Sequence, residues 1–343
     1  TSHVAIETFV TANTVIVGGE VTTKAHLAVE DTVRSVIRDI GYTEPGTGFD
    51  ADSVQITNLI AAQSPDIAQG VSASTNLFGA QGAGDQGIMF GYATDETPEL
   101  LPAPLLYSHK ILKRAALLRK GGVIPWLRPD SKSQISIDYV DFKPVRIDSV
   151  VLSHQHKDTI TRQELEETFR EKLVKPILEE TGLIDASTKY YFNPTGRFVQ
   201  GGPAADTGLT GRKIIVDTYG GAGRHGGGAF SGKDPSKVDR SASYYARYVA
   251  KNLVAAGLAQ RLEIQVAYAI GVPFPVSIYV NSFGTGKKDD GELVKIIKEK
   301  FDFSPAAIIE ELDLLQPIYR SFCTYGHFSH AEAPWEQIGK VSL

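Results

Sequence analysis

The stretch SQISIDYVDFKPVRIDSVVL, residues 133–152, alternates apolar and polar side chains along most of its length. A period of two is typical of strands that bury one face, so the stretch predicts a β-hairpin. An amphipathic helix is expected next. The string TRQE at residues 161–164 predicts its first turn, because an N-cap Thr and a Glu three residues later form a capping box. The helix should extend to about Glu180 and end near Gly182.

The same order of hairpin and helix occurs twice more. TFVTANTVIVGGEV at residues 8–21, with its turn at residues 12–13, precedes a predicted helix over residues 27–40. LEIQVAYAIGVPFPVSIYVNSF at residues 262–283 precedes a predicted helix over residues 292–301. The hairpins start 133 − 8 = 125 and 262 − 133 = 129 residues apart, which favours three related α+β units. Three unrelated copies of a common motif are the alternative.

Two further helices are predicted, over residues 102–120 and 235–258. In the second, Asp234 is the expected N-cap and Pro235 the first helical residue. We therefore expect an α+β fold of three similar hairpin-and-helix domains. Their predicted bounds are residues 1–78 for the N-terminal domain, 79–199 for the central domain and 200–343 for the C-terminal domain.

The composition argues against several classes of function. Lys and Arg number 35 and Asp and Glu number 40, which gives a net charge of 35 − 40 = −5, whereas a general nucleic-acid binder carries a basic excess. The one cysteine, Cys323, can form neither an internal disulfide nor a multi-cysteine metal site, which favours the reducing cytoplasm. No apolar run approaches the roughly 18 residues that span a membrane. We expect neither a membrane span nor a signal peptide.

The most informative loop is GGGAFSGKDPSKVDR, residues 226–240. Consecutive glycines let backbone N–H groups approach an anion, and the N-terminus of the following helix favours negative charge. Lys233 and Lys237 are four residues apart and are expected on one helical face. Asp234 and Asp239 could hold a cation that bridges phosphates. The loop predicts a polyphosphate site with magnesium, and a flexible glycine loop before a capped helix is the alternative.

The same loop nearly matches the phosphate-binding pattern of P-loop proteins. Gly227, Gly232 and Lys233 have the right spacing, but Asp234 stands where that pattern needs Ser or Thr. Residues 213–217 are expected to form a strand, yet nine residues separate them from Gly227, whereas a P-loop follows its strand directly. A P-loop ATPase is therefore a weak interpretation.

Three other loops carry candidate ligands. RFVQGGPAADTGLTGRK at residues 197–213 offers Phe198 for stacking on a base, although a core phenylalanine is equally consistent with the sequence. The same segment supplies Asp206 and the pair Arg212 and Lys213. QGAGDQGIMFGY at residues 81–92 holds Asp85, and WLRPDSKSQ at residues 126–134 holds Asp130 and Lys132. Residues 63–70 and 72–82 have the composition of a mobile loop and linker, typical of a lid. The histidines show no metal-binding spacing.

These segments together resemble S-adenosylmethionine synthetases, in particular the bacterial branch. The resemblance covers essentially the whole chain, and its most specific strings are GAGDQGIMFGYA at residues 82–93 and GGGAFSGKD at residues 226–234. It implies three domains related by pseudo-threefold symmetry. It also implies a dimer with shared active sites, usually paired into a tetramer, that converts ATP, L-methionine and water into S-adenosylmethionine, phosphate and pyrophosphate.

The resemblance also implies roles for individual residues. Lys132, Arg212, Lys213, Lys233 and Lys237 would be catalytic through their charge on the phosphates. The ATP-binding set would be Asp130, Lys132, Arg197, Phe198, Asp206, Arg212, Lys213, Ala229, Lys233 and Lys237. Methionine would contact Glu20, Gln69, Asp85, Asp206 and Lys237. Asp239 would bind Mg²⁺, of which two per site are expected, and Glu7 would bind K⁺.

One departure from the family is serious. The family has a Gly-His-Pro-Asp-Lys segment whose His acts on the triphosphate and whose Asp binds magnesium, and no such string occurs here. We expect an omitted segment between Ser2 and His3, so His3 is not the catalytic histidine. An intact mass of 37.1 kDa would contradict that expectation. A non-catalytic nucleotide-binding relative and an unrelated phosphate-transferring ATPase are the alternatives.

Overall fold

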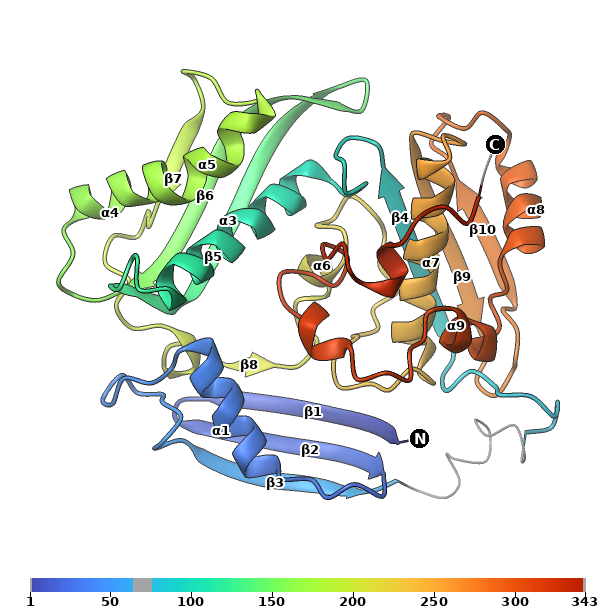
Figure 1. Ribbon diagram of the computed structural model, residues 1–343, viewed down its shortest axis with the longest axis horizontal. Helices are drawn as coiled ribbons and strands as arrows, with labels where there is room; N and C mark the ends of the chain where they lie inside the picture. Colours follow the sequence, from blue (N-terminus) through green and yellow to red (C-terminus); the bar gives the residue numbers. More distant parts are fainter. Residues whose placement is uncertain (1, 64–75, 342–343) are drawn as a thin grey trace.

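The computed structural model describes residues 2–63 and 76–341 and arranges them in three sheets with packed helices (Figure 1). Each predicted hairpin is present, and each belongs to a different sheet. The alternation of apolar and polar residues explains this result, because each sheet places its apolar face against helices. The prediction of an α+β fold with three similar units is confirmed.

The N-terminal sheet has the strand order β3-β2-β1-β8, and helix α1 lies across one of its faces (Figure 1). Its elements are β1 (His3–Thr11), β2 (Thr14–Thr22), α1 (Val29–Ile40), β3 (Gln55–Ala62) and β8 (Gly208–Leu209). The predicted turn is confirmed, and Ala12 within it has a φ of +47°, a value that tight hairpin turns often need. Helix α1 ends at Gly41 in the left-handed conformation, as is common at helix C-termini.

The central sheet has the order β5-β6-β7. Its elements are α3 (Ala103–Lys120), β5 (Leu127–Val140), β6 (Lys143–His156), α4 (Arg162–Thr168), a π-helical stretch (Phe169–Val174), α5 (Lys175–Leu178), a 3-10 turn (Glu179–Thr181) and β7 (Lys189–Phe192). The predicted capping box is confirmed: Thr161 accepts a hydrogen bond from the backbone of Glu164, whose side chain accepts one from the backbone of Thr161. The helical run ends at Gly182 as expected.

The C-terminal sheet has the order β10-β9-β4 and packs on the buried helix α7. Its elements are β4 (Gly87–Thr94), α7 (Val238–Ala255), β9 (Arg261–Tyr268), β10 (Ser277–Asn281), α8 (Asp290–Lys300) and α9 (Pro305–Glu311). A Cβ on Gly91 would lie 2.1 Å from backbone atoms of Ala246, so this glycine lets β4 approach α7 closely. The remaining short helices are Gly202–Ala204, α6 (Ile214–Asp217), Tyr319–Phe322 and Pro334–Glu336.

Strand pairing crosses both predicted domain boundaries. β4 lies within residues 79–199 but pairs antiparallel with β9. β8 lies within residues 200–343 but pairs antiparallel with β1. The three sheets are therefore tied together by backbone hydrogen bonds from segments distant in sequence. The division at residues 78 and 199 itself stays a prediction.

Two local predictions are wrong. The helix expected from Pro235 begins at Val238, because the Asp234 side chain accepts the N–H of Ser236 and the Asp234 carbonyl accepts that of Lys237, which forms a separate turn first. The strand expected at residues 213–217 is the short helix α6. Its residues Ile215 and Val216 are exposed and pair with no strand, so β-branched composition alone misled the prediction.

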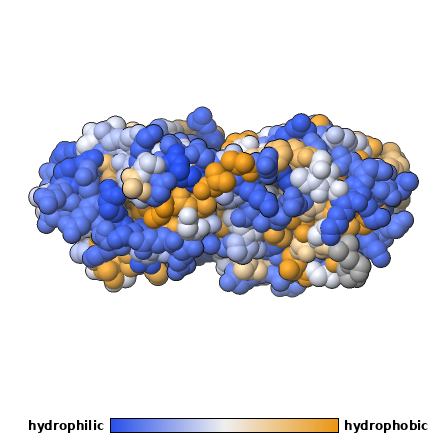
Figure 2. Space-filling view, turned by 90° about the horizontal axis from the view of Figure 1, so that it is seen from above, coloured by the Kyte–Doolittle hydropathy of each residue, from blue (hydrophilic) through white to orange (hydrophobic). Residues whose placement is uncertain are grey.

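The outer surface is mixed in polarity. Viewed from above, apolar patches interrupt an otherwise hydrophilic face (Figure 2). None of the described helices is both long and apolar enough to cross a membrane.

Candidate active site

The two lysines of the glycine-rich loop each contact an aspartate. Lys233 Nζ lies 2.8 Å from Asp239 Oδ2, and Lys237 Nζ donates to Asp234 Oδ2. Both lysines precede the first helical turn of α7, so the expectation that they share one helical face is wrong. Burial would raise the pKa of Asp234, but hydrogen bonds from Lys237 and Ser236 outweigh it, and the pKa of this carboxyl is lowered.

Strand β1 holds residues 232–237, here called the lysine segment, through backbone hydrogen bonds. The N–H of Ile6 donates to Gly232 O over 2.9 Å, and that of Asp234 donates to Val4 O over 3.1 Å. The N–H of Val4 in turn donates to Asp234 Oδ2 over 2.7 Å. Gly232 has a φ of +84°, and a Cβ there would lie 1.9 Å from Ile6 O. Only glycine permits this approach, which fixes Lys233 against the N-terminal sheet.

The glycines before the lysines allow two close approaches, one to the Asp239 carboxylate and one to β4. A Cβ on Gly228 would lie 2.2 Å from Asp239 Cγ, and one on Gly226 would lie 1.6 Å from Ile88 O. The loop also carries His225, whose Nδ1 accepts the N–H of Gly227 over 2.8 Å. Burial lowers the pKa of His225, against the opposing effect of Asp239. A small pocket opens here between β4, the glycine loop and the first turns of α7.

A second cationic loop lies next to the first. The N–H of Thr8 in β1 donates to Thr210 Oγ1 over 2.8 Å. A Cβ on Gly211 would lie 2.2 Å from the Cβ of Ala229, so the loops that carry Ala229 and Arg212 touch. Arg212 and its neighbour Lys213 are exposed, and neither has an ion pair within residues 2–63 and 76–341. Two segments distant in sequence thus place cations along the same edge of β1, opposite the edge that pairs with β2.

The expected nucleotide residues lie on strand β5 and in the loop after β7. Asp130 Oδ2 accepts the N–H of Gly202 over 2.9 Å, which ties β5 to the loop that carries Asp206. Phe198 is half-buried, and His156 Nε2 accepts its N–H over 3.1 Å. Lys132 is exposed on β5. The geometry therefore places Phe198 at the surface, where stacking is sterically possible, and not in a closed core.

Comparison with known proteins agrees with this arrangement. Family models for the N-terminal, central and C-terminal domains of S-adenosylmethionine synthetase match residues 1–65, 80–198 and 200–337. An S-adenosylmethionine synthase of Treponema denticola is 58% identical over 342 residues, which cover 99% of this chain and 88% of that protein. The chain belongs to the S-adenosylmethionine synthetase family. It is an enzyme of this type, which forms S-adenosylmethionine from ATP and L-methionine by attack of sulfur on the 5′ carbon, followed by hydrolysis of tripolyphosphate.

The remaining residues expected from the family lie on separate elements, and the loop of Asp85 meets the lysine segment, because the N–H of Gly84 donates to Ser236 O over 3.0 Å. Glu7 and Glu20 are exposed on β1 and β2, and Asp85 Oδ1 accepts the N–H of Gln86. Gln69 lies outside the described residues, as do most of the predicted loop and linker. Arg197 is exposed and pairs with Asp158, with an N–O distance of 2.7 Å. Among the described residues, no three His, Cys, Asp or Glu side chains form a metal cluster.

Sequence reasoning missed two residues that support the site. Arg240 Nη1 donates to the backbone oxygen of Lys233 over 2.8 Å, and His156 holds the backbone of Phe198. Arg240 adjoins the predicted Asp239, so its position in the quoted loop was the available signal. For His156 the sequence gives no comparable signal, because its partner is 42 residues away.

Proposed function

We propose that the lysine segment, Asp239 and the loop carrying Arg212 and Lys213 bind the triphosphate of ATP. The observation that carries this proposal is that two segments distant in sequence bring these cations to one edge of β1 and to each other. The sulfur of methionine is neutral and triphosphate is the leaving group, so negative charge gathers on the phosphates in the transition state. Preorganised cations are the main source of stabilisation for such charge. The first step needs no general base.

The lysine–aspartate pairs are proposed to exchange partners when substrate binds. Lys233 and Lys237 contact Asp239 and Asp234 in the structure. A magnesium ion at Asp239 would compete with Lys233 for that carboxylate and free the ammonium for phosphate. Asp239 suits this role because Mg²⁺ is commonly held by one or two carboxylates together with substrate phosphates. When bound, the ion would supply neutralisation of phosphate charge.

The other roles are proposals that follow from family membership. Asp130, Lys132, Arg197 and Phe198 would hold the nucleotide. Glu20, Gln69 and Asp85 would hold methionine, with Asp206 and Lys237 between the two substrates. Glu7 would bind K⁺, and a second Mg²⁺ would share the site with the first. We also propose a cytoplasmic location.

A dimer with shared active sites is proposed for the assembly, usually paired into a tetramer. Several large apolar side chains are exposed on strands: Leu59 on β3 is 62% exposed, Tyr279 on β10 51% and Ile88 on β4 45%. Apolar patches of this kind are typical of interfaces between protein chains. A second copy of the chain is the proposed occupant, and sedimentation at micromolar concentration tests it.

A direct assay tests the catalytic proposal. The chain is incubated with ATP, L-methionine, Mg²⁺ and K⁺, and S-adenosylmethionine, phosphate and pyrophosphate are measured. Formation of all three, with phosphate release dependent on methionine, is expected. Phosphate release that does not depend on methionine would contradict the proposed order of the two steps.

A further inference from the structure

Arg240 lies in the first turn of α7 and is 5% exposed. Its guanidinium donates to the backbone oxygen of Lys233 over 2.8 Å and to the hydroxyl of Tyr244 over 3.0 Å. The first bond spans the turn between the lysine segment and the helix. Arg240 therefore holds the backbone of Lys233, whose ammonium group contacts Asp239.

Residues 319–336, here called the C-terminal segment, cover Arg240. The guanidinium lies 4.0 Å from the ring centre of Tyr319, in the range of a cation–π contact. Tyr244, which accepts a hydrogen bond from Arg240, also contacts His327 Nδ1 over 2.7 Å and stacks on Trp335 at 3.9 Å. These aromatic groups exclude water from the guanidinium and supply no negative charge.

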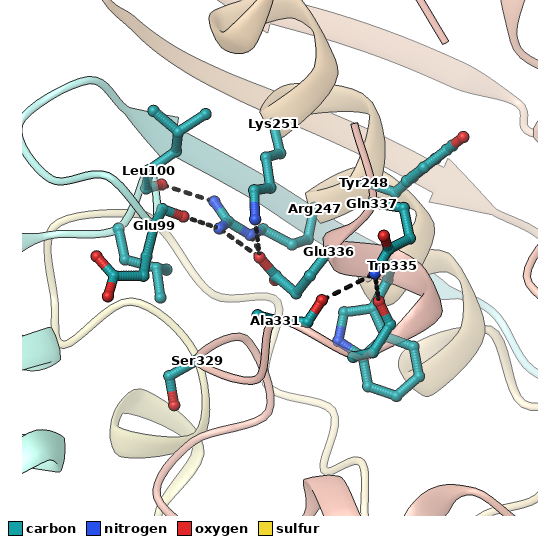
Figure 3. Close-up of polar contacts among 12 residues, drawn as sticks. Glu99, Leu100, Arg247, Tyr248, Lys251, Ser329, Ala331, Trp335, Glu336 and Gln337 are labelled. Carbon is teal, nitrogen blue, oxygen red and sulfur yellow. Dashed lines mark hydrogen bonds and ion pairs between the residues drawn. The ribbon is translucent and has the colours of Figure 1, made fainter. Parts of the chain in front are cut away.

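Arg240 has no ion pair within the described residues. Arg247, seven residues further along the same helix, is also fully buried, but it forms two hydrogen bonds with the Glu336 carboxylate, at 2.9 and 2.8 Å (Figure 3). Removing a cation from water without a counter-charge is unfavourable. A buried unpaired arginine next to a phosphate-binding segment is therefore expected to have a counter-charge in the ligand.

The local charges support this interpretation. Lys233, Lys237 and Arg240 contribute three positive charges, and Asp234 and Asp239 contribute two negative ones, which leaves 3 − 2 = +1 before substrate binds. A polyanion at the lysines would reverse this balance. Coulomb interactions at a partly buried site act over several ångströms, so Arg240 can contribute without contact to the phosphates.

We propose that Arg240 is a positioning residue for the polyphosphate site. It fixes the backbone of Lys233, and its unpaired charge favours a bound polyanion. This inference rests on the proposed role of Lys233. The alternative is a clamp that only attaches the C-terminal segment to α7.

The test measures binding of inorganic tripolyphosphate with Mg²⁺ by calorimetry, together with kcat and KM for ATP. The variants are Arg240→Gln, which removes the charge, and Arg240→Lys, which keeps it. Lys251→Gln is the matched control, because Lys251 is a buried cation on the same helix that pairs with Glu336. The unfolding temperature without ligand is recorded for each protein.

Arg240→Gln should weaken tripolyphosphate binding about tenfold, with a comparable rise in KM for ATP. Arg240→Lys should restore most of the affinity while kcat stays below that of the parent chain, because a lysine cannot replace both the bond to the Lys233 backbone oxygen and the bond to Tyr244. Lys251→Gln should bind as the parent chain does. A folded Arg240→Gln with parental affinity would overturn the proposal. Equal losses in the Gln and Lys variants would also overturn it, since charge would then be irrelevant.

The outcome for the parent chain separates this inference from the proposed function. If the parent chain binds tripolyphosphate but forms no S-adenosylmethionine, the catalytic proposal fails and the Arg240 comparison is still decided by the affinities. If the parent chain does not bind tripolyphosphate, both proposals fail. If it is active and Arg240→Gln matches it, only the inference on Arg240 fails.

Discussion

The two buried arginines of α7 differ in what neutralises them. Arg247 donates to both oxygens of Glu336 and to the backbone oxygens of Tyr92, Glu99 and Leu100 (Figure 3). Arg240 contacts one carbonyl, one hydroxyl and the rings of Tyr244 and Tyr319. The charge of Arg247 is satisfied within the fold, whereas that of Arg240 is not. The end of α7 at Arg247 is neutralised within the protein, and we call it the structural end. The end at Arg240 carries a positive charge that no described carboxylate pairs with, and we call it the ligand end.

The structural end joins three segments. Tyr92, Glu99 and Leu100 belong to the end of β4 and the loop after it, and Glu336 belongs to the last short helix of the chain. Lys251 adds a second cation to the same carboxylate at 2.7 Å. Burial lowers the pKa of Lys251, and the carboxylate of Glu336 opposes that effect. The network therefore fixes the C-terminal segment on α7, and this segment covers Arg240.

Breaking the structural end should give the largest effect on stability. Glu336→Gln leaves Arg247 and Lys251 buried without a counter-charge, which we expect to lower the free energy of unfolding by about 3–5 kcal/mol. Urea unfolding followed by circular dichroism measures it. Glu30→Gln is the control, because Glu30 pairs with Arg34 on the surface of α1 at 2.8 Å, and such pairs contribute about 0.5 kcal/mol. A similar loss in both variants would contradict the assignment of Glu336.

Changing the ligand end should affect turnover more than stability. Lys233→Ala removes a cation that acts on the leaving triphosphate, so kcat should fall about a hundredfold or more, which corresponds to about 2.7 kcal/mol in the activation barrier. Steady-state formation of S-adenosylmethionine measures it. Lys175→Ala on α5 is the control, with no change in turnover expected, because Lys175 is a partly exposed lysine that pairs with Glu171 away from this site. An unchanged rate in Lys233→Ala would reject its role in catalysis.

The sequence was sufficient for features that depend on neighbouring residues. The hairpin over residues 8–21, the capping box at Thr161 and the end of α1 at Gly41 follow from alternation, capping and backbone freedom. The family resemblance was also carried by local strings. Such features need no knowledge of which distant segments meet.

The sequence was insufficient where distant segments meet. The pairing of β4 with β9 joins residues more than 160 positions apart, and nothing in either strand specifies its partner. The i, i+4 spacing of Lys233 and Lys237 suggested a shared helical face, but the turn at Asp234 delays the helix and gives each lysine its own aspartate. Arg240 was missed because its significance depends on its surroundings in the fold. The ligand roles of Glu7, Glu20 and Asp85 stay predictions.

Acid should destabilise the protein at His327, which contacts Tyr244 among the aromatic side chains that cover Arg240. Burial lowers the pKa of His327 to about 3, with Arg240 and His330 adding to the effect. The unfolded chain binds this proton near the ordinary pKa of about 6.5, so the contribution of His327 to stability is lost as the pH falls from about 6.5 towards 3. At pH 5 the loss should be about 2 kcal/mol. Replacing His327 should remove that part of the pH dependence.

The measurement compares the free energy of unfolding at pH 7 and pH 5 in the parent chain and in His327→Gln. The difference between the two pH values should be smaller in the variant by about 2 kcal/mol. The control is His26→Gln, because His26 is an exposed histidine outside the aromatic cover of Arg240. If His327→Gln retains the full acid sensitivity of the parent, the proton does not bind at this histidine on unfolding.

The smallest effect is expected at Arg197, an exposed residue that is proposed to hold the nucleotide. Arg197 and Asp158 are each about two thirds exposed and form a pair at 2.7 Å, and the hydrogen bond from Arg197 lowers the pKa of Asp158. Asp158→Asn should leave the unfolding temperature unchanged, because exposed pairs contribute little. If Arg197 binds ATP, releasing it from Asp158 should lower KM for ATP about two- to threefold. An unchanged KM in Asp158→Asn together with an unchanged KM in Arg197→Ala would remove Arg197 from the nucleotide site, and the cations that matter would then be the ones around β1 and the first turn of α7.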